Sequence, residues 1–113
     1  MDEAVDSATV EQLREVMEDE FHDLLQTYLD TAPVELDHIT NALRVLDAEA
    51  LAQSAHTLKG SSANLGANRL SSLCRDLEVL GKANQLDDET VRLVDLLVKE
   101  YEQVQALLRQ YLA

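Results

Sequence analysis

Apolar side chains recur every three or four residues along most of this 113-residue chain, which is the period of an amphipathic α-helix. The first apolar stripe is short and follows a match to the capping box at residues 9–12, so we expect a short helix that ends near Glu18. A longer stripe runs from Phe21 to Leu46, on both sides of Pro33. Because proline lacks a backbone donor and clashes with the preceding turn, this segment is predicted to kink or break between Asp30 and Pro33.

Three further helices are expected in the second half of the chain. Asp47 is a candidate N-cap for the first of them, and Gly66 can end that helix in a left-handed conformation. The next stripe runs from Leu70 to Leu80, a loop is expected from Gly81 to Asp87, and a last stripe continues to Tyr111. Four substantial helices with short connections predict an all-α fold, an antiparallel four-helix bundle with a short additional N-terminal helix.

The composition agrees with this fold. Three glycines, one proline and no tryptophan favour long helices over strands, and the length suits a single domain over residues 1–113. The single cysteine, Cys74, can form neither an internal disulfide nor a zinc-binding pair. A reducing compartment and a place for Cys74 in the core are therefore expected.

The charge excludes several classes of partner. A formal net charge of -13 repels nucleic-acid backbones and anionic lipid surfaces. Residues 1–4 lack the basic and apolar parts of a signal peptide, and no apolar run is long enough to span a membrane, so we expect a soluble, cytoplasmic protein. His22 and His38 have no metal-ligand spacing to each other or to Cys74, and no metal site is expected.

Candidate chemistry gathers in residues 50–75, a stretch without aspartate or glutamate. His56, Lys59 and Gly60 lie within it at positions that share one face of a helix. A glycine inside a helix costs about 1 kcal/mol relative to alanine, so Gly60 indicates that another protein must come close to the histidine ring. The alternative is that the helix ends near Lys59 and that Gly60 is a C-cap. The apolar stripe, which continues through Ser62, favours the first interpretation.

A neutral imidazole is a competent nucleophile, and its reference pKa of about 6.5 leaves most of it neutral near pH 7. Phosphoryl transfer spreads negative charge over the transferred oxygens, which a cation one helical turn away can stabilise. A single histidine on a helix is in most cases an ordinary edge residue. The combination of His56 with Lys59 and Gly60 predicts a histidine that accepts a phosphoryl group.

The segment from His56 to Gly66 resembles the signature of the histidine-containing phosphotransfer (HPt) family, H-x-x-K-G-[SA]-x-x-x-x-G, and the likeness extends from about Phe21 to Leu112. The resemblance implies a bundle without kinase activity or an ATP site. It implies that His56 accepts the phosphoryl group at Nε2, that Lys59 steadies the phosphoryl oxygens and that Gly60 leaves room for the partner. The implied partners are response-regulator receiver domains and a hybrid sensor kinase. The chain would need no cofactor of its own, because the catalytic Mg²⁺ would belong to the receiver.

Several other residues are candidates for supporting roles. Ser71, Arg75, Glu78 and Lys82 form one stripe at helical spacing, and the resemblance would bring Glu78 and Lys82 nearest to the phosphate. Gln53 is a possible hydrogen-bond partner of the site. Ala52 and Ala63 are expected on a neutral docking face around His56. The alternative for the stripe is an ordinary solvated helix face.

Other functions remain open at this level. A sensor-kinase dimerisation helix usually has an acidic residue directly after its histidine, whereas Thr57 stands here, and no second domain could bind ATP. An acidic helical adaptor, or the excised substrate domain of a chemotaxis-type kinase, would fit the same helices. A free-standing protein is expected, because the chain begins at a methionine and closes at Ala113, just after the last apolar stripe. A monomer is expected, because the bundle can bury the wide apolar face of the last helix, Leu96 included.

Overall fold

A computed structural model describes residues 3–113, and among these residues all regular structure is helical. The elements are α1 (Ser7–Met17), the 3-10 turn η1 (Glu18–Glu20), α2 (Phe21–Arg44), α3 (Ala48–Asn64), α4 (Asn68–Lys82) and α5 (Asp88–Leu112). The predicted bundle of four long helices, preceded by a short one, is confirmed. Residues 1 and 2, in the segment expected to lack a signal peptide, lie outside the described residues.

The first helix begins three residues earlier than predicted, because Asp6 and not Thr9 is its N-cap. The Asp6 carboxylate accepts the backbone N–H of Ala8 at 3.2 Å and the Thr9 hydroxyl at 2.9 Å. An aspartate N-cap satisfies a free backbone donor at least as well as threonine does. The Thr9 hydroxyl is therefore occupied inside the helix.

Of the kink or break predicted near Pro33, the break is wrong, since α2 continues through Pro33 to Arg44. Proline removes one intrahelical hydrogen bond. Apolar side chains on both sides of Pro33 are buried in the same core, so tertiary packing stabilises the helix across this position. The buried residues of α2 are Phe21, Leu25, Tyr28, Leu29, Ala32, Leu36, Ile39 and Ala42.

The predicted ends of α3 are confirmed. Asp47 Oδ1 accepts the Ala50 N–H at 3.1 Å. Gly66 has a φ of 78°, and the N–H groups that follow the helix bond back to its last carbonyls: Gly66 to Ala63 at 3.0 Å, and Ala67 to Ser62 at 2.9 Å. This is the Schellman arrangement, in which a residue in the left-handed region ends the helix.

The boundaries around the next connection differ slightly from the prediction. Gly81 and Lys82 still belong to α4, so the loop begins at Ala83. Asp87 caps α5 through a capping box with Thr90, a pairing that satisfies free donors at the helix start.

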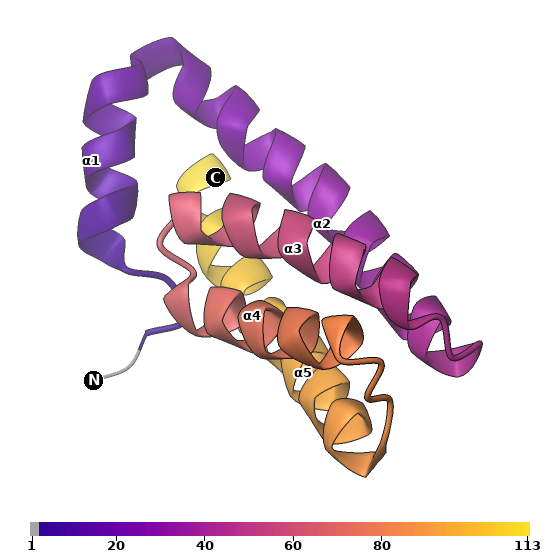
Figure 1. The fold of residues 1–113 in the computed structure, drawn as a ribbon. Coiled ribbons are helices and arrows are strands. Elements are labelled where there is room, and N and C mark those ends of the chain that lie inside the picture. Colours follow the sequence, from indigo (N-terminus) through magenta and orange to yellow (C-terminus); the bar gives the residue numbers. More distant parts are fainter. Residues whose placement is uncertain (1–2) are drawn as a thin grey trace.

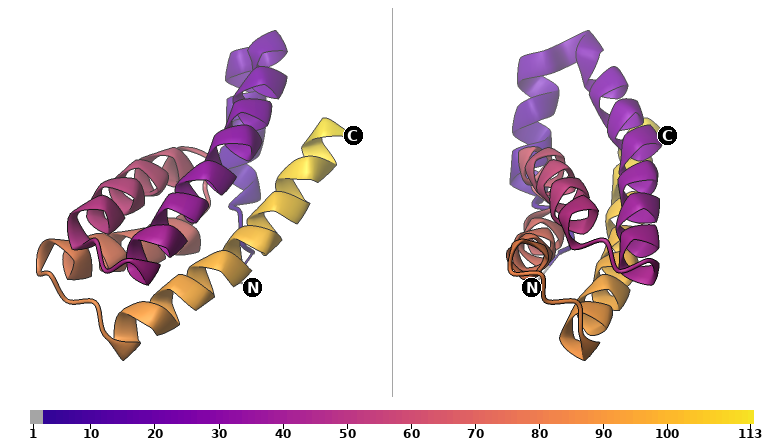
Figure 2. Two further views of the ribbon diagram at one scale, coloured as in Figure 1. Left: turned by 90° about the vertical axis from the view of Figure 1, so that its right-hand side faces the viewer. Right: turned by 45° about the vertical axis from the view of Figure 1, so that its right-hand side comes forward.

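Helices α3 and α4 lie side by side, while α2 and α5 are longer and extend past them at one end of the bundle (Figures 1 and 2). Helix α1 covers this end. The Asp6 N–H donates to the Gly66 carbonyl at 2.9 Å, and Val10 of α1 is fully buried. Phe21 at the start of α2 meets Tyr111 of α5 edge to face, with ring centroids 6.2 Å apart.

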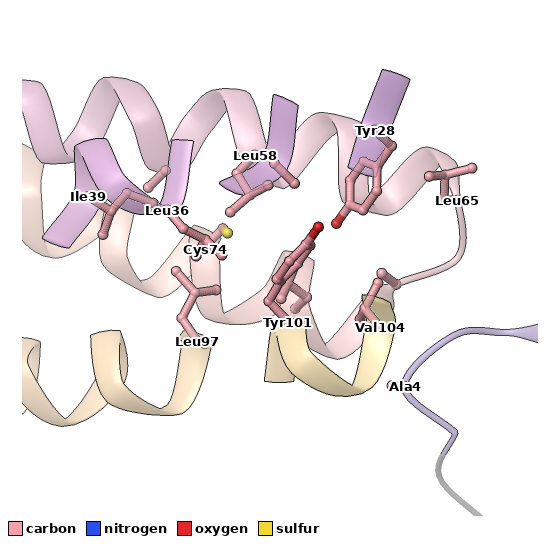
Figure 3. Packing of buried hydrophobic residues seen from close by; sticks show 14 of the residues in the cluster. Ala4, Tyr28, Leu36, Ile39, Leu58, Leu65, Cys74, Leu97, Tyr101 and Val104 are labelled. Carbon is pink, nitrogen blue, oxygen red and sulfur yellow. The ribbon is translucent and has the colours of Figure 1, made fainter. Parts of the chain in front are cut away.

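The core between the helices is apolar, with a few tyrosine and serine hydroxyls. Tyr28 and Tyr101 point their oxygens toward one another in the core (Figure 3), and the Tyr28 hydroxyl lies 2.8 Å from Ser62 Oγ. Cys74 is fully buried, as predicted, and burial raises the pKa of its thiol to about 12. Leu96 differs from expectation, because 39% of it is exposed. Within residues 3–113, no helix is long and apolar enough to cross a membrane.

Candidate functional site

His56 lies in the middle of α3, at the edge of the buried face. Leu51, Ala55 and Leu58 of the same helix point into the core, and one residue step rotates a side chain by about 100°. The His56 side chain is accordingly 66% exposed. The helix continues past Gly60 to Asn64, so the alternative in which Gly60 ends the helix is wrong.

A carboxylate from the neighbouring helix reaches the ring of His56. Glu78 Oε2 on α4 lies 2.8 Å from His56 Nδ1 and 3.0 Å from Lys82 Nζ. Its other oxygen, Oε1, accepts Lys59 Nζ at 2.7 Å. The Glu78 side chain is only 7% exposed, so the carboxylate is held between the two helices.

The surrounding donors keep this carboxylate ionised. The hydrogen bond from Lys59 lowers the pKa of Glu78 most, burial opposes it, and the bonds from Lys82 and His56 add to the lowering, with a resulting pKa of about 2. An ionised carboxylate can only accept hydrogen bonds. In the neutral ring, Nδ1 must therefore carry the proton, and Nε2 keeps its lone pair.

This arrangement corrects the expected acid-free patch. Residues 50–75 contain no acidic side chain, but Glu78 from the next helix touches His56 directly. The ammonium group of Lys59 is also occupied, because it already pairs with Glu78. The charged side chains of Glu78, Lys59 and Lys82 therefore surround His56 and pair with one another. The expectation of a docking face without charged neighbours other than Lys59 is wrong.

Gly81 lines the pocket beside His56 and lies in α4, although the sequence predicts that a loop begins at this residue. A Cβ atom on Gly81 would lie 2.8 Å from the Ala48 carbonyl oxygen and 2.9 Å from Ala52 Cβ. Glycine therefore lets α4 approach α3 more closely than any larger residue could. In the sequence, the sign of this close approach is that Gly81 follows Glu78 by one helical turn and that the preceding helix carries small residues such as Ala48 and Ala52.

A pocket of about 570 Å³ lies between the start of α3 and the end of α4. Its lining residues are Ala48, Glu49, Ala52, Gln53, His56, Glu78, Gly81, Lys82 and Asn84. Ala52 is only 7% exposed and packs against Gly81, so it forms a wall of the pocket and not the open face predicted for it. Ala63 is exposed, almost two turns from His56.

The remaining candidates have simpler surroundings. Apart from the adjoining residues and the backbone of its own helix, no atom of residues 3–113 lies within 4 Å of a Cβ placed on Gly60, which leaves the space beside Lys59 open. Gln53 is exposed at the pocket, and its side chain makes no hydrogen bond within the part of the chain that the structure describes. Ser61 Oγ donates to the Leu58 carbonyl at 3.3 Å, and Ser71 Oγ donates to the Lys59 carbonyl at 3.0 Å.

His22, His38 and Arg75 are all exposed. Among residues 3–113, no group of three or more histidine, cysteine or acidic side chains is arranged to hold a metal ion.

The family model described as Hpt domain matches residues 23–107. This chain belongs to the Hpt domain family. Its structure is similar to histidine-containing phosphotransfer protein B (HptB) from Pseudomonas aeruginosa PAO1, with a TM-score of 0.90 and 33% sequence identity over 96% of this chain and 93% of that chain.

A second relative is a larger protein. The chain is 28% identical to Multistep phosphorelay regulator 1 of Schizosaccharomyces pombe over 87 residues, which is 74% of this chain and 30% of that regulator. The chain thus spans less than a third of the length of that curated relative. The family and the structural likeness together identify a histidine phosphotransfer intermediate of two-component signalling, as the sequence predicted.

Proposed function

We propose that this Hpt domain carries a phosphoryl group on Nε2 of His56, received from the aspartyl phosphate of one receiver domain and passed to the aspartate of another. The observation that supports this most directly is the state of the two ring nitrogens. Nδ1 bonds to an ionised, buried carboxylate, while the exposed ring leaves Nε2 with a free lone pair. Such a nitrogen can attack phosphorus without first losing a proton.

Two neighbours of His56 fit the needs of this reaction. Lys59 is one turn away, and its ammonium group has three donors, so it can turn from Glu78 toward phosphoryl oxygens that arrive at Nε2. Gly60 presents no side chain, which lets the loops of a receiver come close to the ring. Catalysis of phosphoryl transfer consists mainly of positioning and charge stabilisation, and these residues supply both.

The rest of the machinery would come from the partners. We propose that receiver domains and a hybrid sensor kinase exchange phosphate with this chain, that Mg²⁺ is bound by the receiver, and that the chain has no kinase activity of its own. We further propose that it acts in the cytoplasm as a monomer. Sedimentation at several concentrations tests the last point, and a mass that rises with concentration would contradict it.

Labelled phosphoryl transfer tests the role of His56. A receiver domain charged with labelled acetyl phosphate is mixed with the wild-type chain and with His56→Gln. We expect the wild type to gain label in an acid-labile form and His56→Gln to gain none. His38→Gln is the matched control, because His38 is also an exposed helical histidine near a glutamate, with Nδ1 3.4 Å from Glu35. Equal labelling of His56→Gln and His38→Gln would exclude the proposed function.

A further inference from the structure

Helix α4 lies between α3 and α5 (Figure 1), and apolar side chains remain uncovered where α4 meets α5. Val79 of α4 is 60% exposed, Leu96 of α5 is 39% exposed, and Leu80 is half-buried beside Val79. Single apolar side chains on a surface are common, whereas a contiguous group of them marks a surface that binds a partner.

A hollow of about 270 Å³ between the two helices brings these residues together. This α4–α5 hollow is lined by Asp76, Val79 and Leu80 of α4 and by Glu89 and Leu93 of α5. Leu96 follows Leu93 by three residues, so it continues the same face of α5. Sites for small molecules usually measure about 300–1,000 Å³, so the hollow is better suited to a side chain of another protein.

The α4–α5 hollow lies on the opposite side of α4 from the site at His56. Each residue step rotates a side chain by about 100°, so Asp76 and Leu80, two residues before and after Glu78, point about 160° away from it. Glu78 reaches His56 on α3, whereas the hollow faces α5. A protein bound in the hollow would therefore leave His56 open to a receiver domain.

Asp76 determines the charge that a partner must bring. It is exposed, and its carboxylate has no ion pair or hydrogen bond within residues 3–113. Glu89, across the hollow, is already paired with Arg92 at 2.6 Å. Arg75 is adjacent to Asp76 in the sequence, but helical rotation places it on the side of α4 that carries Lys82. The hollow thus presents one carboxylate without a counter-charge.

We propose that the α4–α5 hollow binds an amphipathic helix of a partner protein, which places an aliphatic side chain between Val79 and Leu93 and a lysine or arginine against Asp76. Helices that bind in grooves present such anchors at spacings of three and four residues. This site is separate from the one at His56, so the partner and a receiver domain can be bound at the same time.

The charge of the chain argues against two other occupants. In a symmetric dimer the same surface meets itself, so two copies, each with a net charge of -13, would bring the same acidic edge together. An anionic lipid surface repels the chain for the same reason. A basic helix is attracted where these two occupants are repelled.

Binding of a synthetic peptide tests the inference without the natural partner. The probe is a short helical peptide with leucine on one face and lysine on the other, and its comparator has glutamate in place of lysine. Amide NMR shifts of the chain should change at the residues that line the hollow and at Leu96. The glutamate peptide should bind at least about tenfold more weakly, because it meets Asp76 with a like charge.

Substitutions of exposed residues locate the binding site. Val79→Gln and Leu96→Gln should each weaken binding of the leucine–lysine peptide about tenfold, as expected when an apolar anchor is lost. Asp76→Asn should weaken binding and reduce its dependence on salt. Val16→Gln is the matched control, because Val16 is an exposed valine of α1, and it should bind as the wild type does.

Three results would overturn the inference, since each would indicate attraction to the net charge alone. These are shifts spread over the acidic surface of α1 and η1, equal binding of the two peptides, and wild-type binding by both Val79→Gln and Leu96→Gln. Self-association of the chain that Leu96→Gln abolishes would assign the hollow to a second copy and would overturn the inference as well.

The labelling assay tests whether the two sites are independent, a step that rests on the proposed function of His56. With the peptide bound, the wild type should gain label from a charged receiver at its usual rate. Slower labelling of the wild type, but not of Val79→Gln, would show that the sites overlap and would overturn the inference. His56→Gln should bind the peptide normally, so a failure of the proposed function would leave the peptide result standing.

Discussion

Gly60 stands at an exposed position inside α3, where nearly any other residue would give a more stable helix. Outside its own helix, no atom of residues 3–113 lies within 4 Å of a Cβ placed there, and the helix continues on both sides. The structure of this chain therefore offers no packing reason for glycine. Replacing Gly60 with a larger residue is therefore expected to stabilise the helix and to hinder the approach of a partner to His56.

Gly60→Ala should raise the free energy of unfolding by about 0.5 to 1 kcal/mol, since alanine lowers the backbone entropy lost on folding. Gly60→Leu should also fold, but it should slow transfer from a receiver because its side chain protrudes one turn from His56. Urea unfolding and the labelling assay measure the two effects. Ala106→Leu, at an exposed position of α5, is the control for adding a leucine to a helix surface. Wild-type transfer by Gly60→Leu would show that this space is not used.

Because of Glu78, the free energy of unfolding should depend on pH in the acidic range. Its pKa is lowered from 4.5 to about 2 in the folded state, so its stabilising contribution is fully present above about pH 4.5 and is lost as the pH falls toward 2. Because its lysine partners are partly solvated, we expect a contribution on the order of 1 to 2 kcal/mol.

The measurement is urea unfolding of the wild type and Glu78→Gln at pH 7 and at pH 3. The stability advantage of the wild type should be smaller at pH 3, whereas Asp76→Asn should show a smaller change between the two conditions. An advantage that stays constant with pH would contradict the lowered pKa.

At the scale of elements, the separation of α3 and α4 decides whether the site exists. These two helices meet at Gly81, where the Ala48 carbonyl lies within 2.8 Å of the position a Cβ would occupy. A backbone carbonyl cannot move aside as a flexible side chain can, so a larger residue must push the helices apart. The Glu78 carboxylate, one turn earlier on α4, would move away from His56 with the helix.

Gly81→Ala is therefore expected to destabilise the protein by about 1 to 3 kcal/mol, the usual cost of overpacking. It should also weaken the bond between Glu78 and His56 and slow the transfer reaction. Gly60→Ala is the matched comparison, because the same substitution on the neighbouring helix should have the opposite effect on stability. Urea unfolding measures both, and equal shifts in the same direction would count against the close approach at Gly81.

At the scale of the whole molecule, α1 belongs to the fold and not to the site. It covers the end of the bundle where α2 and α5 extend past the other helices (Figure 2), and it meets the connection between α3 and α4 at Gly66. Gly66 lies beyond the end of α3 at Asn64, and that end is about 12 Å along the helix from His56. Changes in α1 should affect stability and leave phosphoryl transfer unaltered.

Two valines of α1 provide a matched pair. Val10 is fully buried and Val16 is 77% exposed, so Val10→Ala should cost about 1 to 3 kcal/mol, whereas Val16→Ala should change stability by less than about 0.5 kcal/mol. Both variants should accept phosphate at the wild-type rate when they are folded. Thermal or urea unfolding gives the first result and the labelling assay gives the second. A transfer defect in folded Val10→Ala would mean that α1 reaches the partner.

The amino-acid sequence by itself determined the features that depend on neighbours along one helix. The apolar period, Asp47 as N-cap and Gly66 as stop predict α3 correctly, because a cap or a left-handed residue acts within one turn. Helical spacing of three and four residues likewise predicted that Lys59 and Gly60 lie beside His56. The local signals were ambiguous where two residues competed, as with Asp6 and Thr9 at the start of α1.

Tertiary structure decided what depends on contacts between helices. Packing on both sides of Pro33 kept α2 continuous against the local preference of proline. Glu78 could be named as a candidate from its helical stripe, but its contact with Nδ1 of His56 joins residues 22 positions apart. That contact exists because Gly81 lets α4 approach α3. Periodicity along one chain shows which face of a helix is polar, but it does not show how close the next helix comes.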